Sequence, residues 1–317
     1  MEVLGPPRGL IVDLITPLRN DGSIDGRGLG RLLDQLSPLA HALFLASPNT
    51  GEGKNMSLAQ RLELLEKALV VIRGRIPILF WITRDTEEKT AEILLALKKV
   101  AERRRYEGQV FWVDTPLYYH SNRGLPALYQ NLSSMVNEPF ILHNDPKLIK
   151  SLAKPIKRCN IRTGILKELV SLKCIVGLIF LGSLDRAHNY QRACRSRVGF
   201  RIYDGDETNF LDYPSMSGVV SLGANLAPVA WRKTTESSLR ITADRDNYPN
   251  YLYNVWELGQ YLRNLKAIYQ SIPPAIVKGI LSDKGIIETP ICTFPSVDVE
   301  ESKRRIKKLM ARYADSP

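Results

Sequence analysis

Short apolar runs alternate with segments of helical periodicity along roughly the first two thirds of the chain. The runs begin with "GLIVDLITPL", "ALFLAS", "IPILFWI" and "QVFWVDTP", and four more follow, the last being "SGVVSLGAN". Runs that are apolar nearly throughout are typical of parallel strands covered on both faces. Eight strand–helix units within roughly 225 residues predict an α/β fold, specifically a (β/α)8 TIM barrel.

The segments between the strands have the spacing and the start signals of helices. Asp25 precedes one such segment, and Ser57 with Gln60 forms a capping-box pattern before another. After about residue 230 the chain has two further helical stretches and no strand pattern. We therefore expect a barrel over residues 1–229 and a C-terminal helical extension over residues 230–317.

An open, doubly wound sheet is the alternative to a barrel. That fold commonly carries a GxGxxG turn after its first strand, where a dinucleotide binds. No such turn follows the first strand here, and no other strand end carries the fingerprint. The barrel is preferred, and we expect no cofactor.

Composition excludes several other classes of protein. No apolar run approaches the ~18 residues that span a bilayer, and the N-terminus lacks the pattern of a signal peptide. A cytoplasmic protein is therefore expected. The cysteines and histidines show no metal-ligand spacing, so we expect no metal site and interpret the cysteines as scattered buried thiols.

The chain is basic, with a net charge of +11. Such a charge raises nucleic-acid binding as a function, but no motif interleaves aromatic and basic residues as recognition would require. Part of the charge lies in "ESKRRIKKLMARY", whose apolar stripe and basic opposite face indicate a docked terminal helix. Nucleic acid is not an expected partner.

Chemistry in a TIM barrel is placed at the carboxyl ends of the strands. The second strand ends in "SPNTGE", the fourth in "TPLYY" and the fifth in "HNDP". The sixth ends at Ile179 and Phe180, the seventh in "DGDE" and the eighth in "GAN". The residues of these ends are the candidates for a functional site.

The strand ends resemble those of the dihydrodipicolinate synthase and N-acetylneuraminate lyase family of pyruvate-handling aldolases. The family patterns G-T/S-T-G-E, P-Y-Y, Y-N-x-P, G-D-D and G-x-x-S-x-x-x-N-x-x-P correspond here to "SPNTGE", "TPLYY", "HNDP", "GDE" and "GVVSLGANLAP". A late "KGILSDKG" resembles the family segment K-x-x-L-x-x-x-G. The match runs in order along almost the whole chain. The resemblance implies the barrel fold, an aldolase-class carbon–carbon lyase or synthase, and a homo-oligomer, commonly a homotetramer built from dimers.

The resemblance also implies a covalent mechanism in which a lysine at the end of the sixth strand forms a Schiff base with a 2-keto acid such as pyruvate. In this chain Ile179 stands at that position, and an isoleucine forms no imine. His143 replaces the family's proton-relaying tyrosine, and Leu148 replaces its carboxylate-binding arginine. Tyr118 matches, and is a candidate catalytic residue together with His143.

The resemblance implies a substrate-binding set drawn from the second, fifth and eighth strand ends: Asn49, Thr50, Gly51, Asn144 and Ser221. Asn49 replaces the first hydroxyl residue of the family motif, whereas Thr50 matches the second. From the residues themselves, Gly51 and Glu52 favour a role in shaping the loop over a role in catalysis.

Two functions therefore remain open. In the first, the chain is a family member without Schiff-base chemistry that binds a small acid, or acts as a regulatory partner of an active paralogue. In the second, it is an active lyase or aldolase on a keto or hydroxy acid, using a relocated lysine or no imine. Lys54 and Lys147 lie on the expected rim for such a role, whereas Lys167 and Lys173 precede the sixth strand and are expected at the opposite end.

Overall fold

The computed structural model describes residues 5–152, 158–214, 217–239 and 248–314. Within them eight parallel strands form a closed barrel in sequence order, which confirms the predicted (β/α)8 fold and excludes the open sheet. The strands are β1 (Gly9–Asp13), β2 (Ala42–Leu45), β3 (Ile78–Trp81), β4 (Val110–Asp114), β5 (Phe140–Asn144), β6 (Ile175–Phe180), β7 (Arg201–Asp204) and β8 (Gly218–Ser221).

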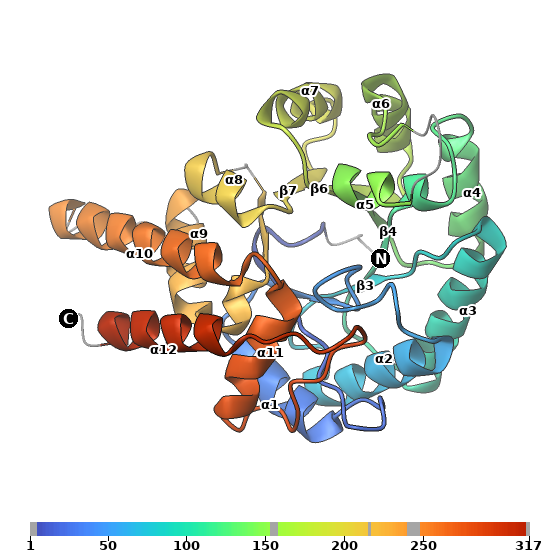
Figure 1. Cartoon of the computed structure of the whole chain (residues 1–317). Helices are drawn as coiled ribbons and strands as arrows, with labels where there is room; N and C mark the ends of the chain where they lie inside the picture. Colours follow the sequence, from blue (N-terminus) through green and yellow to red (C-terminus); the bar gives the residue numbers. More distant parts are fainter. Residues whose placement is uncertain (1–4, 153–157, 215–216, 240–247, 315–317) are drawn as a thin grey trace.

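Helices surround the barrel (Figure 1). They are α1 (Gly26–Leu36), α2 (Leu58–Ile72), α3 (Glu87–Arg103), α4 (Leu125–Met135), α5 (Pro146–Lys150), α6 (Thr163–Ser171), α7 (Leu184–Cys194), α8 (Glu207–Asp212) and α9 (Pro228–Ser238), with short 3₁₀ turns η1 (Pro116–Tyr118) and η2 (Gly223–Asn225). The predicted starts are confirmed: Asp25 caps α1, and Ser57 with Gln60 forms a complete capping box on α2.

Alternation along each strand divides the apolar side chains into two layers, because successive side chains point to opposite faces. One set packs between the strands and the helices, and it includes Phe180. The other set fills the barrel interior: Ile11, Ala42, Phe44, Leu79, Trp81, Phe111, Val113, Ile141, Val176, Ile179, Tyr203 and Val220. Ile179 therefore faces the axis of the barrel, where its register partner on β5 is His143.

Three helices follow α9 in the described chain: α10 (Tyr248–Tyr269), α11 (Pro273–Asp283) and α12 (Glu300–Ala314). In Figure 1, α10 and α12 run side by side on one flank of the barrel. The sequence suggested two helical stretches beyond residue 230, and the expected boundary at residues 229 and 230 falls inside α9. The predicted apolar stripe of the last helix packs inward, with Ile306 fully buried.

Candidate ligand-binding pocket at the barrel mouth

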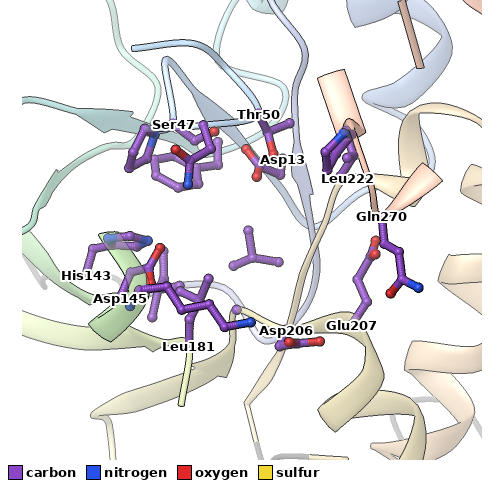
Figure 2. A pocket seen from close by; sticks show the side chains of 18 of the residues that line it. Asp13, Ser47, Thr50, His143, Asp145, Leu181, Asp206, Glu207, Leu222 and Gln270 are labelled. Atoms are coloured by element: carbon purple, nitrogen blue, oxygen red, sulfur yellow. The ribbon is translucent and has the colours of Figure 1, made fainter. Parts of the chain in front are cut away.

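A cavity of about 320 Å³ opens at the carboxyl ends of the strands. Its base is the top of the barrel interior, formed by Phe44, Ile179 and Val220. Figure 2 shows Asp13, Ser47 and Thr50 on one wall, His143 and Asp145 on another, and Asp206 and Glu207 on a third. The cavity thus lies where chemistry is found in this fold.

The loop after β2 forms one rim of the cavity and is held by an extensive set of contacts. Glu52 forms a fully buried ion pair with Lys278 of α11 and accepts a hydrogen bond from the Thr293 amide. The guanidinium of Arg61 donates to the carbonyls of Trp81 (2.9 Å) and Gly53 (2.6 Å). These contacts bind the loop to α2, β3 and the C-terminal helices, which accounts for its turn-rich sequence.

Close backbone approach explains the two glycines of this loop. A Cβ on Gly51 would lie 2.5 Å from the Ser47 amide nitrogen, and one on Gly53 would lie 1.9 Å from the Ala46 carbonyl oxygen. Neither position admits a side chain without moving the loop. Gly51 also accepts a hydrogen bond from the Thr16 hydroxyl (2.8 Å), a contact that shapes the loop rather than the cavity.

Asp13, the last residue of β1, places a carboxylate in the cavity wall. Burial raises its pKa to about 7, although hydrogen bonds from the Ser47 and Thr50 hydroxyls oppose the rise and nearby Glu207 adds to it. Its Oδ1 atom is buried and has no hydrogen-bond partner. An unsatisfied carboxylate oxygen beside a cavity is a ready acceptor for a donor group on a ligand.

Asp13 is not among the site residues predicted from the sequence. The available signal was a charged residue within the otherwise apolar run "GLIVDLITPL". Buried aspartates are rare unless they are paired or functional. The residue belongs in the candidate site together with Ser47, which is likewise absent from the predicted set.

His143, from the end of β5, lines the opposite wall. Burial lowers its pKa to about 4, although the Asp145 carboxylate acts in the other direction. Its Nδ1 lies 2.9 Å from the Thr115 hydroxyl, which accepts a hydrogen bond from the Trp81 indole at 2.9 Å. At neutral pH the imidazole is therefore uncharged and fixed in orientation.

The third wall carries two acidic residues that already have partners. Glu207 accepts hydrogen bonds from the Ser221 hydroxyl (2.6 Å), the Gly223 amide (2.7 Å) and the Tyr269 hydroxyl, while burial raises its pKa. Burial also pushes up the pKa of Asp206, but its ion pair with Lys266 outweighs this and holds the pKa below the usual value.

Two lysines, Lys147 and Lys266, line this cavity within the described chain. The Lys266 ammonium is engaged by Asp206 and by the Thr208 hydroxyl. Lys147 extends from α5 and is exposed. Lys54 lines a neighbouring groove instead, and Lys167 and Lys173 lie in or just after α6, before the start of β6.

Some of the site residues predicted from the sequence line the cavity, and others hold the loops around it. Asn49, Thr50, His143 and Ile179 line the cavity. Gly51 and Ser221 hold the surrounding loops, as described above. Asn144 holds the segment before α6, because its Oδ1 accepts a hydrogen bond from the Ile161 amide at 2.8 Å.

Tyr118 lies in η1 outside the residues that line the cavity. Its ring packs edge-on against Trp81, with the ring centroids 6.3 Å apart.

Within the described residues no group of three or more histidine, cysteine, aspartate or glutamate side chains is arranged to hold a metal ion. None of the described helices has the length and apolar character to span a membrane.

Comparison with known proteins gives a consistent result along nearly the whole chain. The model of the dihydrodipicolinate synthetase family matches residues 6–312. The 4-hydroxy-tetrahydrodipicolinate synthase of Alcanivorax borkumensis is 26% identical over 311 residues, covering 96% of each chain.

Solved structures of such synthases share the fold. The enzyme from the thermoacidophilic methanotroph Methylacidiphilum fumariolicum SolV superposes with a TM-score of 0.77 at 22% identity, covering 97% of this chain and 96% of that one. The chloride-inhibited dihydrodipicolinate synthase from Acinetobacter baumannii, complexed with pyruvate, gives a TM-score of 0.76 at 20% identity, covering 97% and 99%.

Proposed function

The chain belongs to the dihydrodipicolinate synthetase family, and from this premise we propose that it binds a small organic acid at the barrel mouth without forming a Schiff base. Its role is then that of a binding protein or of a regulatory partner of an active paralogue. The proposal separates the aldolase-like scaffold from the covalent chemistry that such scaffolds support.

The observation that carries the proposal is the side chain of Ile179. It lies at the carboxyl end of β6, faces the barrel axis and is 1% exposed. It belongs to an apolar cluster that includes Phe44 and Val220, with Leu181 packed against it. An amine at this point would be desolvated enough to act as a nucleophile, whereas the isoleucine offers no reactive atom.

The lysines that line the cavity are poor replacements. Imine formation needs an unprotonated amine, which requires burial or a neighbouring cation to lower the lysine pKa. The Lys266 ammonium is instead held by the Asp206 carboxylate, which favours the charged form. Lys147 is exposed at the rim and lies near the same carboxylate.

A small acid is supported as the ligand by the relatives, one of which was solved with pyruvate, and by the side-chain amide of Asn49, a hydrogen-bond donor at the cavity wall. We extend the proposal to a homo-oligomer, a dimer or tetramer, in the cytoplasm. The exposed aromatic pair Tyr253 and Trp256 on α10 is a surface of the kind that such contacts use.

The proposal is tested by treating the wild-type protein with pyruvate and borohydride, which reduces any imine to a stable adduct. The intact mass is expected to stay unchanged. Peptide mapping covers Lys54, Lys147 and Lys266. An adduct of pyruvate mass on any of them overturns the proposal and identifies the nucleophile.

A second function, an active lyase that uses no imine, is favoured by one specific observation. Asp13, with a pKa of about 7, and the uncharged His143 line the same cavity and have the properties of a general acid–base pair. Exchange of the pyruvate methyl protons in D₂O, followed by NMR, discriminates the two. Exchange catalysed by the wild type and lost in Asp13→Asn supports the lyase, and its absence supports the binding protein.

A further inference from the structure

The cavity at the barrel mouth adjoins a second, outer groove of about 710 Å³ between the ends of α5 and α7. The two spaces share five lining residues: Asn49, Asp145, Lys147, Leu181 and Asp206. The two spaces are therefore neighbours, and their charges differ.

The outer groove is basic. Four cationic side chains line it: Lys54, Lys147, Lys150 and Arg186. Two carboxylates also line it, but both are engaged. Asp145 accepts hydrogen bonds from the Lys147 amide (2.9 Å) and the Leu148 amide (3.1 Å), and Asp206 pairs with Lys266. Within the described chain the four cations form no ion pair, and they outnumber the two carboxylates, so the groove carries net positive charge.

The inner cavity lacks this excess of cations. Besides the shared Asp145, Lys147 and Asp206, it is lined by Asp13, Glu207, Lys266 and an uncharged His143. Of these carboxylates Asp13 differs from the others, because its buried Oδ1 has no hydrogen-bond partner. The Ser47 and Thr50 hydroxyls, which are natural donors to a ligand carboxylate, are directed at Asp13 instead.

We propose that the pocket takes a zwitterionic or comparably polarised acid, with an ammonium head against Asp13 and an anionic tail, carboxylate or phosphate, in the outer groove. The ammonium satisfies the unpartnered oxygen and offsets the inner negative charge. The anion neutralises the lysines and the arginine of the groove. A simple keto acid has no hydrogen-bond donor for the Asp13 carboxylate. It is also too short to occupy both the inner cavity and the outer groove.

This ligand class rests on the proposed function, a pocket that binds an acid without forming an imine. The new element is the position of the ligand's acid group. The carboxylate sits outside, over α5 and α7, and a hydrogen-bond donor occupies the inner wall. Figure 2 shows the inner arrangement, with Asp13 and Thr50 on the wall opposite His143 and Asp145.

The test is a matched series of small probes measured by isothermal titration calorimetry. The series contains 4-aminobutyrate, 6-aminohexanoate and 3-aminopropylphosphonate, with butyrate lacking the head and butylamine lacking the tail. We expect the best amino acid probe to bind about tenfold or more tightly than butyrate, as charge-assisted hydrogen bonds allow. A tighter phosphonate indicates a phosphate tail, and an equal or weaker one indicates a carboxylate.

Variants assign the two ends. Asp13→Asn is expected to remove the advantage of the aminated probes over butyrate while leaving butyrate unchanged or tighter. The pair Lys147→Gln with Arg186→Gln is expected to weaken every anionic probe. Lys173→Gln, an exposed lysine next to the start of β6, is the matched control and is expected to change nothing.

The wild-type series alone is sufficient to overturn the proposal, whether or not the variants fold. Butyrate binding as tightly as the amino acids, or no probe binding more tightly than about 10 mM, contradicts it. These outcomes differ from failure of the proposed function, which would show as a borohydride-stable pyruvate adduct.

Discussion

The loop after β2 and the floor of the cavity lie within one barrel mouth, yet only the loop keeps the family pattern of residues. The loop keeps the Thr-Gly-Glu pattern of the family, and Glu52, Gly53 and Arg61 hold it by buried contacts. The floor instead has Ile179 where the resemblance places a lysine, and the cavity wall carries the carboxylate of Asp13, whose Oδ1 is buried.

The difference teaches that a loop motif and a reactive group are subject to separate constraints. Gly53 and Glu52 are constrained by packing and by a buried ion pair in this chain, so replacing either disturbs the loop itself. Replacing the reactive group with an isoleucine of suitable size leaves the interior packed. A retained loop is therefore strong support for the fold and weak support for the reaction.

The largest expected effect breaks the loop side of this comparison. Glu52→Gln removes one partner of the ion pair with Lys278, in which both side chains are at most 1% exposed. An unpaired buried ammonium costs about 3–5 kcal/mol, so the free energy of unfolding in urea should fall by that amount. Glu63→Gln is the matched control, because its pair with Lys67 is about one-third exposed on both sides and is worth less than about 1 kcal/mol. Equal effects from the two variants would contradict the structural role given to Glu52.

The next effect concerns the cavity side. The pKa of Asp13 rises from 3.8 to about 7 on folding, so the folded state is favoured while the group is protonated and loses stability as pH rises from about 4 through about 7. The loss is on the order of 4 kcal/mol at most, at 1.36 kcal/mol for each unit. Asp13→Asn should therefore be more stable than the wild type at pH 8 and close to it at pH 4. Parallel stability curves for the two proteins would count against a buried, unpaired carboxylate.

A smaller effect of opposite sign is expected from His143. Its pKa falls from 6.5 to about 4 on folding, because the folded state disfavours the protonated imidazole. The free energy of unfolding is therefore unaffected by this group above about pH 6.5 and decreases as the pH falls toward 4. The loss is about 3 kcal/mol at most. His143→Gln should flatten the decline in the free energy of unfolding between pH 6.5 and 4. An unchanged slope would mean that the imidazole protonates freely in the folded protein.

Much of the fold could be predicted from the sequence, because periodicity and caps are local signals. The eight apolar runs, the cap at Asp25 and the capping box at Ser57 all follow from neighbouring residues, and the structure confirms them. Side chains alternate between the two faces of β6, so Ile179 points either into the barrel or toward the helices. The pairing of β6 with β5 places it inside.

The site was less predictable, because it depends on distant partners. Burial raises the pKa of Asp13 against the hydrogen bonds of Ser47 and Thr50 from another strand end, and its buried Oδ1 finds no hydrogen-bond partner among the described residues. Lys266 lies far along the chain in α10, and only folding brings it to Asp206. Sequence spacing carries no signal for either relation, whereas an isolated charge within an apolar run does mark the residue for inspection.

The central claim is that the missing amine at the end of β6 separates this barrel from imine chemistry. The most direct test compares the intact masses of wild type and of Ile179→Lys in the Asp13→Asn background, after both are treated with pyruvate and borohydride. Asp13→Asn is included because the Asp13 carboxylate lines the same cavity and favours the protonated form of a new lysine. The account predicts an unchanged wild-type mass and a pyruvate adduct on residue 179 of the variant. A wild-type adduct, with or without one in the variant, would contradict it.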